Sequence, residues 1–229
     1  GICTGDSLKA EPFGKWFNPN YESYAPNPVY TTSLKKQRFE NIQIKVFFGT
    51  WCGDSKREVP RFLKLLSAIS FPENKVQLIA LGGSDSLVKQ SPGHEEAGLG
   101  IFRVPTFVIY KNGTEINRIN EFPVFSLEKD LLAILSDQPY SPNYRSFSTI
   151  LKWLKDGTLS EENNSARGLA EQLRPLVADE TGEPLRGERS GYDFRPQIVG
   201  VFTDLAGPAP PGLEFSATID SRYSTSPTM

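Results

Sequence analysis

Cysteine, histidine and methionine are scarce in this chain, which holds two cysteines, one histidine and one methionine in 229 residues. Two cysteines are too few for a disulfide framework. The single histidine, His94, is followed by Glu95 and Glu96, but adjacent residues rarely converge on one metal ion. We therefore expect no metal site, and nothing in the sequence indicates a cofactor.

The sequence also lacks a long hydrophobic run and an excess of either charge. No stretch is long or apolar enough to span a bilayer. A net charge of −2 argues against nucleic acid as a partner and against a polybasic membrane patch. We expect no nucleic-acid partner, and contact with a membrane only if Cys3 carries a lipid.

The most informative stretch of the sequence runs from Ile42 to Ile69. It opens with an apolar run rich in β-branched and aromatic residues up to Gly49, which predicts a buried strand. It closes with the amphipathic pattern of an α-helix, made by Val59, Phe62, Leu63, Leu66 and Ile69. Cys52 therefore lies where a strand turns into a helix.

This position gives Cys52 a chemical environment that can be predicted. The first turn of a helix presents unpaired N–H groups and the positive end of the macrodipole, which stabilise a thiolate, the nucleophilic form of cysteine. Asp54 opposes that effect, whereas Lys56 and Arg57 oppose Asp54. The alternative is a buried and inert cysteine, since free cysteine is often buried.

Trp51-Cys52-Gly53-Asp54-Ser55 resembles the active-site turn of the thioredoxin superfamily, with Ser55 in place of the second cysteine. The segment Glu58-Val59-Pro60 resembles the Glu-x-Pro of the extracytoplasmic thioredoxin-like reductases of the cytochrome-maturation type. Val104-Pro105-Thr106-Phe107 resembles the cis-proline segment that lies against the active cysteine in that family. The resemblance covers roughly residues 42–135.

The resemblance implies an α/β fold, namely a thioredoxin-like three-layer α/β/α sandwich with a mixed central sheet. Strands are expected at residues 42–49, 76–81, 106–110 and 115–119, the last two joined by an Asn112-Gly113 hairpin. Further helices are expected from Tyr30 with Thr31 or Thr32 as cap, from Ser84 or Asp85 to Gln90, and after a cap at Ser126. Amphipathic helices are expected near residues 147–157 and 160–177, and the apolar residues from Phe194 to Phe202 suggest one strand. We predict four regions: an N-terminal extended arm at 1–29, the thioredoxin-like domain at 30–138, a C-terminal helical extension at 139–178, and a loosely ordered tail rich in glycine and proline at 179–229.

The resemblance also implies a function, thiol–disulfide exchange by a monothiol oxidoreductase or isomerase. Cys52 would be the nucleophile, and Ser55 would hydrogen-bond the sulfur or only satisfy a helix N–H group. The surface that holds substrate would comprise Trp51, Gly53, Asp54, Val104 and Pro105. Expected partners are proteins or low-molecular-weight thiols and disulfides, because Ser55 cannot resolve a mixed disulfide.

An alternative function is a redox-inactive binding module that keeps the thioredoxin frame and holds a peptide or protein. The loss of the second cysteine at Ser55 and the apolar Val46, where many thioredoxins keep an acidic residue, favour this alternative. A periplasmic or other extracytoplasmic location is favoured over the cytoplasm. Cys3, close to the first residue, could carry a lipid anchor there, or it could be an ordinary thiol in a frayed terminus.

Overall fold

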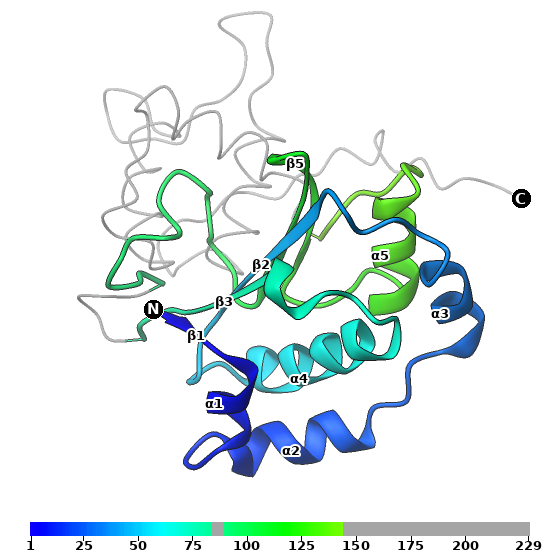
Figure 1. Cartoon of the computed structure of the whole chain (residues 1–229). Coiled ribbons are helices and arrows are strands. Elements are labelled where there is room, and N and C mark those ends of the chain that lie inside the picture. The colour runs from blue at the N-terminus through cyan, green and yellow to red at the C-terminus, as the bar shows by residue number, and fades with distance from the viewer. Residues whose placement is uncertain (84–88, 144–229) are drawn as a thin grey trace, which may run out of the picture.

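The computed structural model describes residues 1–83 and 89–143 of the chain (Figure 1). Its centre is a five-stranded mixed sheet in the order β1-β3-β2-β4-β5. Strand β2 is parallel to β3, and the other neighbours are antiparallel. The strands are β1 (Ile2–Cys3), β2 (Ile42–Phe48), β3 (Val76–Ala80), β4 (Thr106–Lys111) and β5 (Thr114–Asn120).

Five α-helices and one short 3-10 helix accompany the sheet in the described residues. The longest helix, α4, directly follows the central strand β2. The helices α1, α2, α3 and α5 lie on the same side of the sheet as α4 (Figure 1). The helices are α1 (Gly5–Lys9), α2 (Gly14–Ser23), α3 (Pro28–Leu34), α4 (Gly53–Ala68), η1 (Glu73–Lys75) and α5 (Leu127–Leu135).

All four strands predicted from the sequence are present, and the hairpin between β4 and β5 has the predicted turn. Asn112 and Gly113 both have positive φ, at 53° and 78°, which is the backbone conformation that Asn-Gly favours in a two-residue hairpin. The predicted cap of α5 is also confirmed, because the Ser126 hydroxyl accepts a hydrogen bond from the Lys129 N–H at 3.2 Å.

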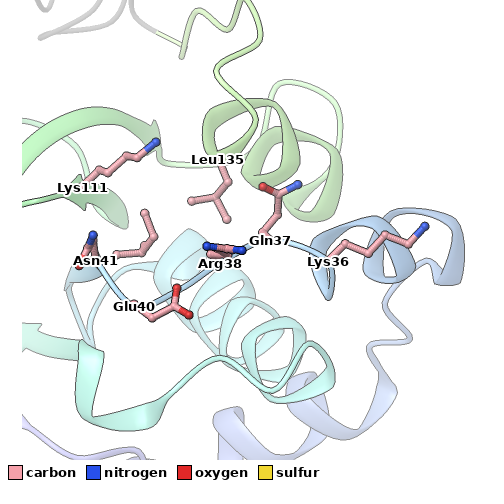
Figure 2. Close-up of a pocket in the computed structure, with 8 residues that line it drawn as sticks. Lys36, Gln37, Arg38, Glu40, Asn41, Lys111 and Leu135 are labelled. Atoms are coloured by element: carbon pink, nitrogen blue, oxygen red, sulfur yellow. The ribbon is translucent and has the colours of Figure 1, made fainter.

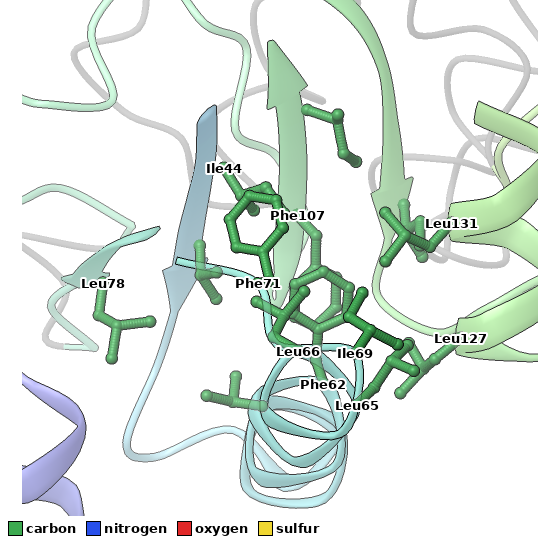
Figure 3. Packing of buried hydrophobic residues seen from close by; sticks show 14 of the residues in the cluster. Ile44, Phe62, Leu65, Leu66, Ile69, Phe71, Leu78, Phe107, Leu127 and Leu131 are labelled. Atoms are coloured by element: carbon green, nitrogen blue, oxygen red, sulfur yellow. The ribbon is translucent and has the colours of Figure 1, made fainter. Parts of the chain in front are cut away.

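The main hydrophobic core lies between one face of the sheet and the five helices. Each helix contributes at least one buried side chain to it, and alternate residues of β2 (Ile42, Ile44, Val46 and Phe48) point into it. Figure 3 shows α4 seen end-on beneath the sheet, with Phe62 directed at the strands and Leu65 on the side of Leu127 of α5. Phe62 meets Phe107 of β4 with ring centroids 4.3 Å apart.

The opposite face of the sheet is covered differently, and this corrects the predicted three-layer α/β/α sandwich. Phe47, Ile79 and Val108 point to that face, where they pack against Ile101 and Val104 from the segment between β3 and β4. Within the described residues no α-helix covers this face. The predicted helix that would begin near Ser84 falls largely on residues 84–88, outside the described part of the chain.

The predicted extended arm at the N-terminus is wrong, because its residues form β1, α1 and α2. The prediction relied on proline as a helix breaker, yet Pro19 lies inside α2. Packing of α2 on α4 outweighs that local cost. Phe17 is completely buried, and the Lys64 ammonium lies 4.7 Å from the centre of the Tyr21 ring.

The helix predicted from Tyr30 onward starts earlier than expected. It begins at Pro28, and its cap is Asn27, whose side chain accepts a hydrogen bond from the Val29 N–H, rather than the predicted Thr31 or Thr32. The helices predicted near 147–157 and 160–177, and the strand suggested near Phe194, lie outside the described residues. The predicted domain boundaries stay predictions.

Candidate functional site

Cys52 occupies the position that the sequence indicates, between the end of β2 and the start of α4. It is the N-cap residue of α4 and has an extended backbone conformation, and its side chain makes no capping hydrogen bond. The side chain is half-buried. The thiol therefore lies at the positive end of a helix of 16 residues, with part of its surface open to solvent.

The segment around Pro105 lies directly against this cysteine. The Val104–Pro105 peptide bond is cis, as the resemblance implied, and the Cys52 thiol donates a hydrogen bond to the Val104 carbonyl with 3.1 Å between Sγ and O. Residues 52 positions apart in sequence thus form one surface. Pro105 itself is buried, so Val104 supplies the polar backbone group of this contact.

Ser55 does not make either of the contacts that the sequence analysis proposed for it. It is fully buried, and its hydroxyl accepts a hydrogen bond from the Gly49 N–H at 3.1 Å. This bond ties the end of β2 to the first turn of α4, so its evident contribution is to hold the turn that carries Cys52.

Trp51 is held firmly although 46 % of its surface is exposed. Its indole N–H donates to the Leu81 carbonyl at 3.2 Å. The ring lies against Gly49 and Gly83, where an added Cβ would come within 2.6 Å and 2.4 Å of the indole. Such an oriented, half-exposed ring is a surface on which a ligand can pack without further ordering of the side chain.

Gly53 and Asp54 complete the predicted set at the start of α4. Gly53 is exposed, and a Cβ there would meet no atom. Asp54 forms an ion pair with Arg57 at 2.8 Å. The carboxylate beside the thiol is therefore partly balanced by a guanidinium one turn along the helix.

Three charged residues near Cys52 were not predicted from the sequence, namely Lys89, Arg103 and Glu121. Burial, and next the charge of Arg103, lower the pKa of Lys89 to about 8, while Glu121 and Cys52 act in the opposite direction. Burial also raises the pKa of Glu121. The hairpin register could have revealed Glu121, because Asn120 pairs with Thr106 and the Glu121 N–H bonds the Pro105 carbonyl at 2.6 Å.

The structure therefore brings together Trp51, Cys52 and Val104, while Ser55 and Pro105 are buried supports of the same turn. The roles predicted for these residues, and the predicted thiol and disulfide partners, stay predictions. Among the described residues, no group of three or more histidine, cysteine or carboxylate side chains is arranged to hold a metal ion. None of the described helices combines the length and the apolar character that crossing a membrane requires.

Cys3 lies in the edge strand β1, which β3 separates from the strand β2 that leads to this site. Its neighbour Ile2 pairs with Ile79, and Cys3 itself pairs with Leu78. Burial raises the pKa of the Cys3 thiol. The alternative of a thiol in a frayed terminus is therefore wrong, since the residue belongs to the sheet.

The comparisons with known proteins concern a later part of the chain. Residues 162–222 match the model of a family described as "Arabinosyltransferase concanavalin like domain". A protein named "Probable arabinosyltransferase C" from Mycobacterium tuberculosis is 82% identical over 51 residues, which is 22% of this chain and 5% of that protein. Its counterpart from Mycolicibacterium smegmatis is 80% identical over 51 residues, with the same coverage of both chains.

A second group of relatives carries a related name. A protein named "Probable arabinosyltransferase B" from Mycobacterium tuberculosis is 66% identical over 52 residues, which is 23% of this chain and 5% of that protein. The matching segment thus spans about a twentieth of the length of these relatives. The family model begins at residue 162, after the last described residue.

These matches correct the interpretations that followed from the resemblance to thioredoxin-like reductases. The matching family is an arabinosyltransferase domain, which overturns the assignment to the thioredoxin superfamily, and its concanavalin-like class, a β-sandwich architecture, counts against the predicted α/β fold class. The matching proteins are named for arabinosyl transfer. These names overturn the prediction of a thiol–disulfide oxidoreductase or isomerase that acts through Cys52, and with it the prediction of a redox function. They also leave the alternative of a redox-inactive peptide- or protein-binding module without support. Over residues 162–222, the chain is similar to the concanavalin-like domain of arabinosyltransferases.

Proposed function

We propose that residues 162–222 give this chain a role in recognising carbohydrate that contains arabinose. The observation that carries the proposal is the 82% identity over 51 residues to arabinosyltransferase C. Two segments this similar carry nearly the same hydrogen-bonding groups and aromatic rings. The 66% identity to arabinosyltransferase B means that many of the same side chains recur in a second related protein. This recurrence supports a sugar contact that both proteins share.

The proposed role is binding, and not complete arabinosyl transfer. Glycosyl transfer requires a donor site, an acceptor site and acid–base groups held in one geometry. A segment that spans 5% of a relative is short for all of these. The proposal therefore assigns to residues 162–222 a contribution to sugar recognition, to which other parts of this chain add contacts.

The composition of the matched segment suits such a role. Sugars present hydroxyl groups to hydrogen-bonding side chains and flat C–H faces to aromatic rings. Residues 162–222 include both kinds of side chain, among them Tyr192, Phe194, Asp204 and Phe215. These residue types are the ones that a carbohydrate-binding surface needs.

We further propose an extracytoplasmic location, because long carbohydrate polymers are displayed outside the cytoplasmic membrane. A lipid anchor on Cys3 belongs to the same proposal. Anchoring would make Cys3 the first residue and would remove Ile2, which pairs with Ile79 of β3. Mass spectrometry of the native N-terminus tests this point, and an unmodified Cys3 preceded by Gly1 and Ile2 would contradict it.

The function is tested by titrating the full chain with an oligosaccharide of arabinose and, separately, with one of galactose of equal length. Isothermal calorimetry is expected to give saturable binding of the arabinose compound and binding at least about tenfold weaker for the galactose compound, a difference of about 1.4 kcal/mol. Equal affinity for the two, or no binding of either, would refute the proposal.

A further inference from the structure

A cavity of about 680 Å³ lies between the end of α5, the end of β4 and the segment that joins α3 to β2. Its volume is within the range of small-molecule sites, which is roughly 300–1,000 Å³. We call it the Arg38 cavity. Figure 2 shows its lining, with Leu135 on α5 and Lys111 on the far side from Lys36. The lining residues are Lys36, Gln37, Arg38, Glu40, Asn41, Ile42, Lys111 and Leu135.

The lining of the Arg38 cavity carries more positive than negative charge. Lys36, Arg38 and Lys111 are cationic, and Glu40 is the one carboxylate among the lining residues. No ion pair among the described residues involves any of the three cations. The carboxyl ends of α3 and α5 lie nearby and each contribute roughly half a negative charge. The balance remains positive by about one charge, which favours an anionic ligand.

The backbone that carries these side chains is fixed by hydrogen bonds from three directions. The Lys75 ammonium donates to the Phe39 carbonyl at 2.9 Å and also to the Glu40 carbonyl. The Asn112 N–H donates to the Asn41 carbonyl at 2.9 Å. Gln37 Nε2 donates to Ser136 Oγ at 3.3 Å. The backbone of the segment is therefore held in place, whereas Lys36, Arg38 and Lys111 are exposed and their side chains become ordered on binding.

The cavity also has an apolar part, which narrows the class of ligand. Leu135 is half-buried, so its exposed part can cover carbon atoms, whereas Ile42 is only 4 % exposed and lies beneath it. A guanidinium presents paired N–H donors that match phosphate oxygens, and lysine ammonium groups add point charges. We propose that the Arg38 cavity binds a phosphomonoester of a small organic molecule, with the phosphate at Arg38 and Lys111 and the carbon part on Leu135. This site is separate from the carbohydrate role proposed above.

The site is tested with the full chain and three probes: ribose 5-phosphate, ribose and inorganic phosphate. Ribose 5-phosphate is expected to bind most tightly, inorganic phosphate more weakly and ribose not measurably, as judged by calorimetry. If inorganic phosphate binds as tightly as ribose 5-phosphate, the apolar part of the cavity contributes nothing and the proposed ligand class is wrong. If no probe binds, the site is wrong altogether.

Variants separate this cavity from general attraction of anions to the protein. Arg38→Ala and Lys111→Ala are each expected to weaken ribose 5-phosphate binding at least about fivefold, the equivalent of roughly 1 kcal/mol. Glu40→Gln is expected to strengthen it. Lys15→Ala is the matched control, because Lys15 is an exposed lysine of α2 that pairs with Glu11. Equal losses in the Lys15 and Arg38 variants would overturn the proposal.

Discussion

Replacement of Gly83 by alanine should displace the Trp51 indole. A Cβ on Gly83 would lie 2.4 Å from Cδ1 and 2.6 Å from Nε1 of Trp51, well inside van der Waals contact. Because Gly83 faces the indole with its main chain, which cannot shift as easily as a side chain, the Trp51 ring is expected to move instead. The movement would break the hydrogen bond from the indole N–H to the Leu81 carbonyl at 3.2 Å.

The size of the effect follows from what Trp51 buries. A fully buried aromatic side chain covers roughly 150–250 Å², and Trp51 is 46 % exposed, so about 100 Å² is at stake. At about 25 cal/mol per Å² this is about 2.5 kcal/mol, and the hydrogen bond adds about 1 kcal/mol. These contributions sum to about 3.5 kcal/mol, and the lower unfolded-state entropy of alanine offsets about 0.5 kcal/mol, so Gly83→Ala should lower the free energy of unfolding by up to about 3 kcal/mol.

A double-mutant cycle isolates this contact. Gly83→Ala, Trp51→Ala and the double variant are unfolded in urea and followed by far-ultraviolet circular dichroism, which does not depend on the tryptophan signal. With the ring removed, the alanine has nothing to strike, so a coupling energy of up to about 3 kcal/mol is expected. Gly53→Ala is the matched control, because a Cβ at Gly53 meets no atom. Effects that add to within about 0.5 kcal/mol would refute the clamped position of Trp51.

Three further predictions concern buried groups. Burial lowers the pKa of Lys89 from 10.5 to about 8, which corresponds to about 3 kcal/mol. Lys89→Met should raise the unfolding free energy at pH 7 by about 2 kcal/mol, because it also removes the hydrogen bond from the ammonium to the Phe102 carbonyl, worth about 1 kcal/mol. Between pH 8 and 10.5 the unfolded chain keeps the Lys89 proton that the folded chain has lost, so the stability of the unsubstituted protein rises with pH. The gain from Lys89→Met should therefore shrink over this range in urea titrations, and a constant gain would contradict the prediction. Asp130 accepts hydrogen bonds from the Val124 and Phe125 N–H groups at 2.6 and 3.1 Å. Asp130→Ala should therefore lower the free energy of unfolding in urea by about 2–4 kcal/mol. A loss under about 0.5 kcal/mol would count against this role. In protein that carries no lipid on Cys3, burial raises the pKa of the thiol. Iodoacetamide should therefore modify Cys3 more slowly than a free thiol at pH 7, and modification at the free-thiol rate, measured by peptide mass spectrometry, would disprove this.

Local patterns in the sequence predicted much of the described secondary structure. The apolar run of β2, the Asn112-Gly113 turn and the cap at Ser126 each depend on residues close in sequence, so their physics is visible there. Helix α2 was missed because its stability comes from Phe17 and Tyr21 packing on α4, a tertiary effect that outweighs Pro19.

The covering of the second face of the sheet was not predicted, for a related reason. A helix between β3 and β4 was expected from the family resemblance and from Ser84 or Asp85 as caps, and most of it lies outside the described residues. Among the described residues, Ile101 and Val104 from an irregular segment cover that face of the sheet. Arg118 shows how such a segment is held, because it donates to the Leu99 carbonyl at 3.0 Å from the buried end of β5. No short-range pattern announces that contact.

The candidate site was predicted in position, but its supporting contacts were not. Cys52 and Val104 were expected to meet, and their hydrogen bond is present. The glycines beside Trp51 and the bond from Gly49 to Ser55 depend on exact geometry, which a single sequence does not specify. The similarity of residues 162–222 was missed because frequent glycine and proline suggested a loose tail, although short strands with such turns are also typical of β-sandwiches.

The central claim is that residues 162–222 confer recognition of arabinose-containing carbohydrate. The most direct measurement compares calorimetric binding of the arabinose oligosaccharide to the full chain and to a variant in which those residues are replaced by a glycine–serine linker of equal length. The account predicts that the variant keeps the urea midpoint of the full chain and loses binding. Binding of unchanged affinity in the variant would contradict it.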